Sequence, residues 1–195
     1  MGEQAPFGVV VLISGSGSNL QAIIDAELPI TLRAVSSNKA EAYGLERARQ
    51  AGIPTEVIDH REYPDRAAFD AALQQRIDRY QPELVVLAGF MRILTDELVN
   101  HYRGRMINIH PSLLPKYRGT NTHARAIEAG DTVAGCSVHW VTPELDAGPV
   151  ILQAEVPIHP GDSADTLAAR VLEQEHKIYP EAIRRIASGE IDRQG

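Results

Sequence analysis

The sequence predicts an α/β protein built on an open, mostly parallel, doubly wound sheet that is flanked by helices. Short apolar runs of strand length alternate with amphipathic stretches of helix length. The first apolar run, at 9–13, leads through a glycine- and serine-rich loop into a helix. The chain closes on a long amphipathic segment that predicts a C-terminal helix. No repeat or linker divides the sequence, so one domain over 1–195 is expected.

The strands are predicted from apolar runs that are too short for a helix and are bounded by glycine, proline or polar residues. Buried strands are expected at 9–13, 32–36, 55–58, 84–88 and 106–109, and further extended runs at 133–141 and 150–158. The first half of this pattern is Rossmann-like, because each strand is followed by a helix that can return the chain to a parallel neighbour.

The helices are predicted from apolar residues at helical spacing and from their end signals. The first carries Leu20, Ile23 and Ile24 on one face, and the second covers 42–50 and stops at Gly52. Further helices begin at the N-cap residues Asp65 and Thr95, cover 122–129, and form the final stripe of Leu167, Val171, Ile178, Ala182, Ile183 and Ile186.

The composition excludes several classes of protein. Of 195 residues, 19 are Lys or Arg and 26 are Asp or Glu, which gives a net charge of −7 and disfavours nucleic-acid binding through phosphate neutralisation. The longest early apolar run is far shorter than a membrane span, and the first six residues lack the cationic start of a secretory signal. Cys136 is the only cysteine, which excludes an intrachain disulfide. We therefore expect a cytoplasmic protein without membrane or nucleic-acid partners.

The loop at 14–18 has the composition of a phosphate site. Its glycines allow backbone N–H groups to approach a ligand at a helix N-terminus. Leu20 stands where the dinucleotide fingerprint needs a third glycine, and no lysine completes a Walker loop. The pattern favours a single phosphate monoester, although a tight turn with no ligand explains the same residues.

Asn108 and His110 lie two residues apart at the end of a predicted strand. Both should project to one side, while Ile107 and Ile109 face the opposite layer. Because ligands bind at the carboxyl ends of strands in such sheets, the pair is a candidate catalytic group, with a surface or core histidine as the alternative. Asp146 lies in a turn-rich segment and could approach His110 only through the tertiary fold.

The other histidines and the cysteine suggest no further chemistry. Cys136 is expected to be a small core residue, and His139 shares a strand face with Ser137. No metal is predicted, because the remaining histidines fit no metal-binding spacing: His60, His101, His123, His159 and His176.

Four segments together carry a resemblance to a known family. They are Ser14-Gly15-Ser16-Gly17-Ser18-Asn19-Leu20, Gly89-Phe90-Met91-Arg92-Ile93-Leu94, Asn108-Ile109-His110-Pro111-Ser112-Leu113-Leu114-Pro115 and Asp146-Ala147-Gly148-Pro149. In this order they resemble the phosphoribosylglycinamide formyltransferases, one family of the folate formyltransferase superfamily. The similarity runs from about residue 9 to residue 183.

This resemblance implies transfer of a formyl group from 10-formyltetrahydrofolate to the amine of glycinamide ribonucleotide, a step of purine biosynthesis that releases tetrahydrofolate. It implies a catalytic group of Asn108, His110 and Asp146 and no metal. The residues implied for the ribonucleotide are Gly17, Ser18, Asn19, Leu172, Glu173, Gln174 and Glu175. Those implied for the folate co-substrate are Arg66, Met91, Arg92, Ile93, Leu94, Asn108, Thr142, Pro143, Glu144, Leu145 and Asp146. Asn121 departs from relatives that carry a second histidine at that position.

The resemblance also divides the chain into two halves. Residues 1–105 are expected to bind the phosphate and ribonucleotide, and residues 106–195 to hold the catalytic and folate-binding residues. Two alternatives are a formyltetrahydrofolate hydrolase-like enzyme and a non-catalytic folate- or phosphate-binding module. A methionyl-tRNA formyltransferase would need a further domain that 195 residues are not expected to hold. Small molecules are the expected partners, and the protein is expected to be a monomer or a homodimer.

Overall fold

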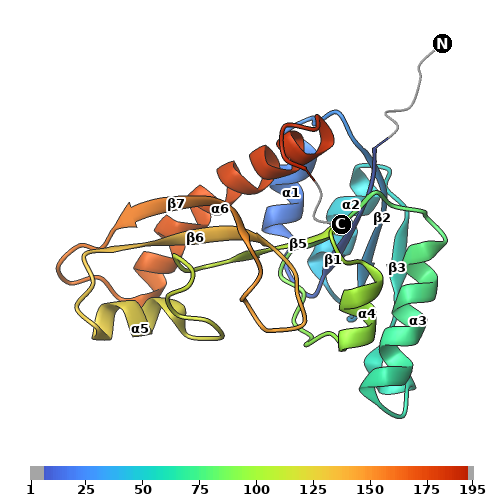
Figure 1. The fold of residues 1–195 in the computed structure, drawn as a ribbon, viewed down its shortest axis with the longest axis horizontal. Coiled ribbons are helices and arrows are strands. Elements are labelled where there is room, and N and C mark those ends of the chain that lie inside the picture. The colour runs from blue at the N-terminus through green and yellow to red at the C-terminus, as the bar shows by residue number, and fades with distance from the viewer. Residues whose placement is uncertain (1–6, 193–195) are drawn as a thin grey trace.

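A computed structural model of the chain describes residues 7–192, which form a seven-stranded sheet covered by helices on both faces (Figure 1). The strands are β1 (Gly8–Ile13), β2 (Thr31–Ser37), β3 (Thr55–Val57), β4 (Leu84–Leu87), β5 (Met106–His110), β6 (Val133–Trp140) and β7 (Val150–Pro157). The helices are α1 (Ser18–Asp25), α2 (Tyr43–Gln50), α3 (Arg66–Asp78), α4 (Asp96–His101), α5 (Thr122–Glu128) and α6 (Ala164–Ala187), with a 3-10 turn, η1 (His60–Glu62). The ends 1–6 and 193–195 of the predicted domain lie outside the described residues.

The strand order is β3-β2-β1-β4-β5-β6-β7. Strands β1 to β5 are parallel, whereas β6 runs antiparallel to β5 and β7 antiparallel to β6. The predicted open, mostly parallel, doubly wound sheet is therefore confirmed. The β6–β7 hairpin extends the sheet away from its parallel part (Figure 1).

Two apolar layers hold the helices on the sheet, because alternate residues of each buried strand point to opposite faces. On one face, Val9 and Val11 of β1 pack with side chains of α1, α2 and α6. On the other face, Val10 and Leu12 pack with side chains of α3 and α4. The predicted apolar stripe of the final helix faces the sheet, and Cys136 is a buried core residue, as expected.

Residues with short polar side chains begin several of these helices. The side chains of Asp65, Thr95 and Ser163 accept hydrogen bonds from backbone N–H groups in the first turns of α3, α4 and α6. Helices α1, α2 and α5 have no side-chain cap, and the N-cap of α1 is Gly17. The first N–H groups of α1 are therefore left without a side-chain partner.

The strand order reverses between β1 and β4, and this places the loops after the two strands side by side. Beneath this edge, the Tyr179 hydroxyl of α6 donates to the Leu87 carbonyl at 2.6 Å and lies 3.3 Å from the Ile107 carbonyl. This buried contact ties α6 to the ends of β4 and β5. It thereby fixes the helix that carries Leu172 to Glu175 against the strand that carries Asn108.

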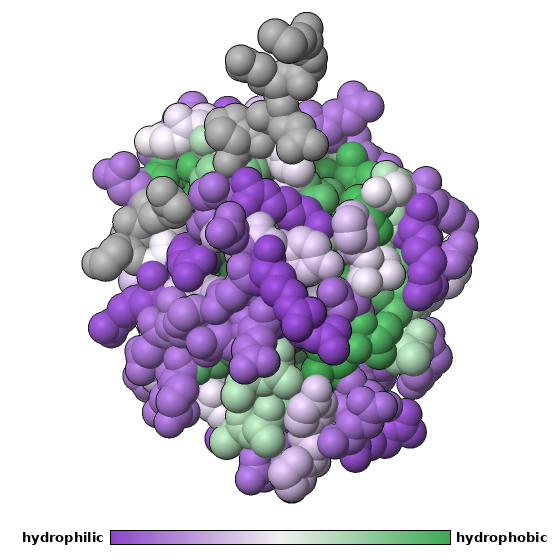
Figure 2. Space-filling model, turned by 90° about the vertical axis from the view of Figure 1, so that its right-hand side faces the viewer, coloured by the Kyte–Doolittle hydropathy of each residue, from purple (hydrophilic) through white to green (hydrophobic). Residues whose placement is uncertain are grey.

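The outer surface is mostly hydrophilic on the side that carries α3, with small hydrophobic areas between polar side chains (Figure 2). This matches the pattern of α3, whose Phe69, Asp70, Leu73 and Ile77 are buried while Ala71 and Gln75 are exposed. Over residues 7–192, no helix combines the length and the apolar character needed to cross a membrane.

Candidate active site

Asn108 and His110 project from the carboxyl end of β5, on the face opposite Ile107 and Ile109. The alternation of side chains along the strand buries the two isoleucines in the layer that α6 covers. The two polar residues therefore share one face, as the sequence predicts. His110 is only 6% exposed, so its contacts are with protein groups.

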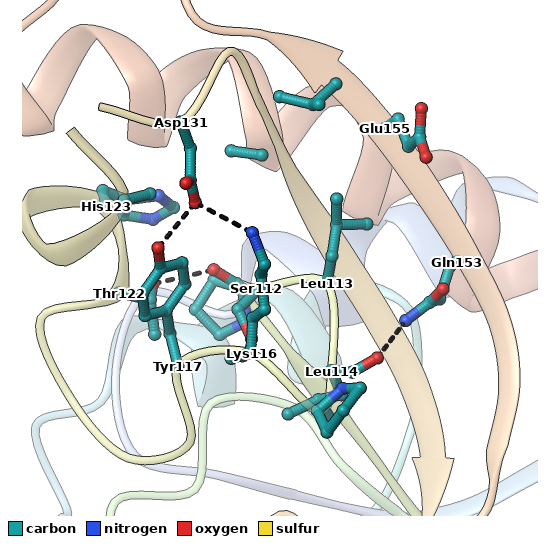
Figure 3. Close-up of a pocket in the computed structure, with 15 residues that line it drawn as sticks. Ser112, Leu113, Leu114, Lys116, Tyr117, Thr122, His123, Asp131, Gln153 and Glu155 are labelled. Carbon is teal, nitrogen blue, oxygen red and sulfur yellow. Dashed lines mark hydrogen bonds and ion pairs between the residues drawn. The ribbon is translucent and has the colours of Figure 1, made fainter. Parts of the chain in front are cut away.

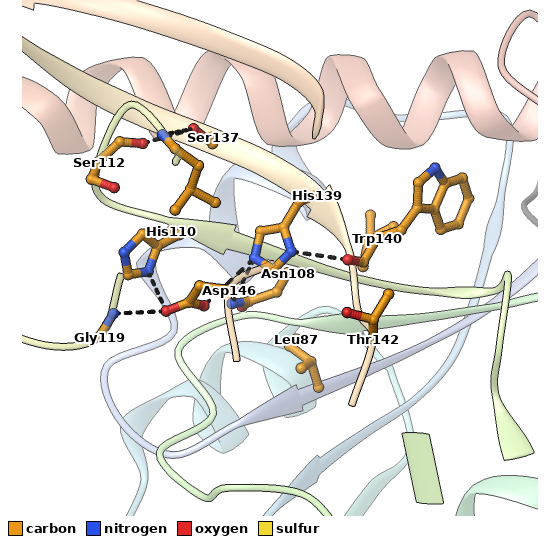
Figure 4. A network of polar contacts seen from close by, with 12 residues as sticks. Leu87, Asn108, His110, Ser112, Gly119, Ser137, His139, Trp140, Thr142 and Asp146 are labelled. Atoms are coloured by element: carbon orange, nitrogen blue, oxygen red, sulfur yellow. Dashed lines mark hydrogen bonds and ion pairs between the residues drawn. The ribbon is translucent and has the colours of Figure 1, made fainter. Parts of the chain in front are cut away.

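The imidazole of His110 lies between two oxygen acceptors. Its Nε2 donates to the Tyr117 carbonyl at 2.8 Å, and its Nδ1 lies 3.5 Å from Oδ2 of Asp146 (Figure 4). An imidazolium donates from both ring nitrogens, so this arrangement fits the charged form of the ring. The structure thus brings together the three residues that the sequence predicts as a catalytic group.

Asp146 reaches this position through the loop between β6 and β7. Its backbone is left-handed, with φ 52°, a conformation that Asp adopts more readily than most residues. Its Oδ2 accepts from the Gly119 N–H at 2.9 Å. Arg118 also pairs with Glu144 across the same two loops, at 3.1 Å. The loop around Gly119 and the loop around Asp146 therefore close together over His110.

His139 completes this group, and the sequence assigns it no role. It pairs with Asn108 across β5 and β6, and its Nε2 lies 3.5 Å from Asn108 Nδ2 and 3.8 Å from Asp146 Oδ1 (Figure 4). Its Nδ1 lies 3.0 Å from the Trp140 carbonyl, which can only accept. Burial lowers the pKa of His139, against the smaller effects of the Trp140 bond and of Asp146. The role of His139 depends on the antiparallel register of β5 and β6, which pairs it with Asn108. The spacing of residues in the sequence does not predict that register.

A cavity opens beside Asn108 and Asp146 and is lined mainly by apolar side chains. Its lining residues are Leu87, Phe90, Arg92, Ile93, Leu94, Val99, Asn108, His139, Val141, Thr142, Pro143, Leu145 and Asp146. The Arg92 guanidinium lies over the Phe69 ring at 4.8 Å, and its buried Nε has no hydrogen-bond partner. We call this space the β5 cavity. A flat heterocycle with several polar atoms fits such a lining.

Most of the residues predicted for the folate side line the β5 cavity, but three do not. Arg66 lies in a shallow depression between the starts of α3 and α4, with Thr95, Asp96 and Glu97. Met91 lines the space beside the glycine loop. Glu144 is exposed and pairs with Arg118 outside the cavity.

The glycine loop forms a second cavity, lined by residues 14–19, Lys39, Ala88, Gly89 and Met91, which we call the loop cavity. The loop carbonyls point away from it, since Gly15 O accepts from Gly44 N at 3.0 Å and Ser16 O from Arg47 Nε at 2.7 Å. Gly17 has φ +75°, and a Cβ there would lie 2.6 Å from the Gly44 Cα. Glycine is thus required by both conformation and contact.

One hydrogen bond joins the residues predicted on α6 to those predicted around the glycine loop. Asn19 Nδ2 donates to Oε1 of Glu175 at 3.2 Å, while Asn19 Oδ1 is buried without a partner. Burial raises the pKa of Glu175, and the Asn19 bond opposes this to a smaller extent. None of the predicted residues of this helix lines either cavity: Leu172, Glu173, Gln174 and Glu175.

Behind the segment that follows His110 lies a further cavity of about 310 Å³ (Figure 3). Asp131 bonds the Tyr117 hydroxyl at 2.6 Å and lies 3.4 Å from Lys116 Nζ. Gln153 donates to the Leu114 carbonyl at 2.9 Å. These contacts fix the segment 111–117, and so the Tyr117 carbonyl that accepts from His110.

Ser137 lies opposite His110 on β6 and supports the same segment. Its hydroxyl donates to the Ser112 carbonyl at 2.7 Å and accepts from the Leu114 N–H at 3.1 Å. Among the residues that the structure describes, no group of three or more His, Cys, Asp or Glu side chains is placed to hold a metal ion.

Comparison with known proteins agrees with this geometry. The family model described as formyl transferase matches residues 8–183. The phosphoribosylglycinamide formyltransferase of Escherichia coli (strain K12) is 59% identical over 187 residues, which cover 94% of this chain and 88% of that protein. The human trifunctional purine biosynthetic protein adenosine-3 is 49% identical over 193 residues, 97% of this chain but 19% of that longer protein.

Solved structures extend the similarity to the fold. The phosphoribosylglycinamide formyltransferase of Coxiella burnetii matches with a TM-score of 0.93 and 57% identity, covering 97% of this chain and 91% of that one. Glycinamide ribonucleotide transformylase 1 of Symbiobacterium toebii matches with a TM-score of 0.92 and 48% identity, over 96% and 90% of the two chains. This chain belongs to the formyl transferase family and, within it, to the phosphoribosylglycinamide formyltransferases.

Proposed function

We propose that this protein transfers the formyl group of 10-formyltetrahydrofolate to the amine of glycinamide ribonucleotide, giving formylglycinamide ribonucleotide and tetrahydrofolate in purine biosynthesis. The observation that carries the proposal is the meeting of Asn108, His110 and Asp146 at the carboxyl end of β5 in a member of this family. The β5 cavity begins at Asn108 and Asp146, and the loop cavity lies at the same edge of the sheet.

In this reaction the substrate amine attacks the formyl carbon and forms a C–N bond. The carbonyl electron pair moves to oxygen and leaves a tetrahedral intermediate with an alkoxide. The attacking nitrogen loses a proton, N10 of the folate gains one, and the carbonyl re-forms as the C–N10 bond breaks. The protein must therefore stabilise a transient negative oxygen and assist proton transfer between two nitrogens.

Asn108 is proposed to donate to the alkoxide, and His110, whose two ring nitrogens face the Tyr117 carbonyl and Asp146, is proposed to stabilise it through positive charge. The Asn108 amide contributes N–H donors on the side of the β5 cavity. His110 contributes positive charge, which its contact with Asp146 favours by pairing the imidazolium with a carboxylate. A buried site increases these effects, because fixed donors there act in a medium of low dielectric constant.

The folate is proposed to bind in the β5 cavity. Apolar side chains such as Leu87 and Val141 would contact the two faces of the ring system, and the unpartnered Nε of Arg92 would find an acceptor on the ligand. We propose that Met91, Glu144 and Arg66 contact the more distant parts of the co-substrate, since they lie outside the cavity itself.

The ribonucleotide phosphate is proposed to lie on the glycine loop, with Gly17, Ser18 and Asn19 around it and Leu172 to Glu175 toward the ribose. The uncapped N-terminus of α1 supports this, because its free N–H groups suit an anion. We propose one domain, whose first half (1–105) binds the phosphate and ribonucleotide and whose second half (106–195) holds the catalytic and folate-binding residues. The lining of the β5 cavity adds one feature: residues 87–99 of the first half contribute to the folate side.

The expected setting of this activity is the cytoplasm, with small molecules as partners. The one cysteine of the sequence is buried and free, as suits a reducing compartment.

The test is a formyl-transfer assay with the purified protein and 10-formyltetrahydrofolate, run with and without glycinamide ribonucleotide. We expect tetrahydrofolate to form only when the ribonucleotide is present, with one formylglycinamide ribonucleotide for each tetrahydrofolate. Release of formate without the acceptor would instead indicate a hydrolase. Binding of both ligands by calorimetry with no turnover would indicate a non-catalytic module.

A further inference from the structure

The loop cavity contains one charged side chain, and its role follows from what the rest of the cavity lacks. Residues 14–19, Ala88, Gly89 and Met91 contribute backbone, hydroxyl, amide and thioether groups but no formal charge. Lys39 is the one ionisable side chain among the residues that line this cavity. A phosphomonoester carries nearly two negative charges at neutral pH. Neutral donors alone leave that charge without a counter-charge.

The backbone around Lys39 is fixed beside the glycine loop. Ser37, the last residue of β2, pairs with Ile13 at the end of β1. The Ser37 hydroxyl donates to the Lys39 carbonyl at 2.9 Å and accepts from the Lys39 N–H at 3.0 Å. One residue earlier, Asn38 Oδ1 accepts from the Ser14 hydroxyl at 2.6 Å. Lys39 is thus held at the edge of the sheet where the loop begins.

The ammonium of Lys39 is not engaged by a carboxylate. The side chain is exposed, and within residues 7–192 it forms no ion pair. The nearby cation Arg47 is in the opposite situation, because its guanidinium donates to Ser16 O and to Gln21 Oε1 and lies 4.9 Å from the centre of the Tyr43 ring. Arg47 therefore supports the loop from behind, and Lys39 remains available to a ligand.

We propose that Lys39 is the residue that recognises the phosphate dianion of the ribonucleotide, pairing its ammonium with a phosphate oxygen while the loop N–H groups bind the others. The inference rests on the proposed function and deepens it. It makes Lys39 a specificity-determining residue, which separates the ribonucleotide from the corresponding uncharged riboside. Lys39 lies outside the group around His110, so its charge acts on substrate binding and not on the formyl-transfer step.

The test compares Lys39→Met and Lys39→Arg with Arg103→Met as a matched control. Arg103 is exposed and precedes β5 at the opposite edge of the sheet, so its replacement removes one positive charge far from the loop cavity. A charge-assisted hydrogen bond contributes about 1.5–3 kcal/mol, which corresponds to a roughly tenfold to hundredfold change in affinity. We expect Lys39→Met to raise the KM for glycinamide ribonucleotide by about that factor, with kcat and the KM for the folate unchanged. Lys39→Arg should retain most of the affinity, and Arg103→Met should behave as the unaltered enzyme.

A second measurement separates the phosphate from the rest of the substrate. Inorganic phosphate should inhibit the unaltered enzyme in competition with the ribonucleotide, and Lys39→Met should weaken this inhibition. The dephosphorylated riboside should react with the same kcat/KM in both proteins, because it lacks the group that Lys39 recognises.

A Lys39→Met enzyme with an unchanged ribonucleotide KM and unchanged phosphate inhibition would overturn the inference and leave the proposed function intact. An equal loss with riboside and ribonucleotide would also overturn it, since the effect would then be structural. Absence of formyl transfer in the unaltered protein would refute the proposed function. In that case, calorimetry with inorganic phosphate still decides whether Lys39 binds the anion.

Discussion

The side chains of His139 and Asn108 face each other across the β5–β6 pair, with His139 Nε2 3.5 Å from Asn108 Nδ2. The Trp140 carbonyl holds the proton of the ring on Nδ1, so Nε2 presents a lone pair to the amide. One N–H of Asn108 is directed at His139 in consequence, and the other remains for a substrate oxygen. His139 is thus a positioning residue for the donor that the proposed mechanism needs.

Replacement of His139 by Phe should therefore reduce kcat, because the Asn108 amide loses the acceptor that orients it. We expect kcat to fall by about tenfold to a hundredfold, less than for removal of an oxyanion donor itself, with both KM values little changed. His139→Gln, whose carbonyl can accept from Asn108, should recover part of the loss. His159→Phe, at an exposed position, is the control. If His139→Gln were as impaired as His139→Phe, orientation of Asn108 would not be the role of His139.

Replacement of the proposed catalytic residues should remove turnover but not ribonucleotide binding. Asn108→Ala should lower kcat by roughly 10²–10³, the loss that follows removal of one oxyanion donor in other enzymes. His110→Ala should also lower kcat, because the positive charge beside the alkoxide is lost. The Kd for the ribonucleotide, measured by calorimetry, should change little, because the phosphate is proposed to bind at the glycine loop.

Asp146→Asn should reduce kcat through His110, since the neutral amide no longer favours the imidazolium. If the two residues act as a unit, the double variant His110→Ala/Asp146→Asn should be no slower than His110→Ala alone. Fully additive losses would show that Asp146 acts independently of His110. Asp165→Asn, at the exposed start of α6, provides the control for loss of a carboxylate.

Replacement of Glu175 by Gln should stabilise the fold. It should also weaken ribonucleotide binding, because Glu175 is among the residues proposed to face the ribose and the variant replaces its carboxylate with an amide. Burial raises the pKa of Glu175, so the folded state binds more protons than the unfolded state above about pH 4.5. The stability of the unaltered protein is thus greatest below the unfolded pKa and declines as pH rises toward the folded value. The variant lacks this decline, while its carbonyl can still accept from Asn19.

The measurement is urea unfolding of both proteins at pH 5 and pH 8, together with the KM for the ribonucleotide. We expect the free energy of unfolding of Glu175→Gln to exceed that of the unaltered protein more at pH 8 than at pH 5. Glu128→Gln, which removes an exposed carboxylate on α5 away from both cavities, is the matched control. An equal difference at both pH values would mean that ionisation of Glu175 does not contribute.

Replacement of Gly148 by Ala should displace the loop that carries Asp146. A Cβ at Gly148 would lie 1.7 Å from the Trp140 carbonyl oxygen, so the backbone has to move. We expect a loss of about 1–3 kcal/mol in the free energy of unfolding, typical of overpacking, together with a reduced kcat.

Gly161→Ala is the control for Gly148→Ala, because that glycine has φ +84° but no atom within 4 Å of the added Cβ. It should cost only the penalty of the left-handed backbone, roughly 1–2 kcal/mol, with kcat unchanged. Unchanged kcat in Gly148→Ala would show that Asp146 does not depend on the tight approach of this loop.

The sequence predicts most of the fold because its signals are local. Apolar runs identify the buried strands, and the N-caps Asp65 and Thr95 start helices where the structure has them. The side on which Asn108 and His110 lie also follows from a local rule, since alternate residues of a strand face the same side. The resemblance to formyltransferases, carried by four short segments, led to the family that the comparisons show.

The sequence by itself determined the order of strands and helices and the pairing of Asn108 with His110 on one face, because these depend on period and propensity over a few residues. The tertiary structure alone decided that β6 runs antiparallel to β5 and that His139 lies beside Asn108. It also decided that Asp146, which follows His110 by 36 residues in the sequence, contacts His110 from its loop. Contacts of this kind depend on sheet register and loop closure, which join distant parts of the chain and leave no periodic signal in the sequence.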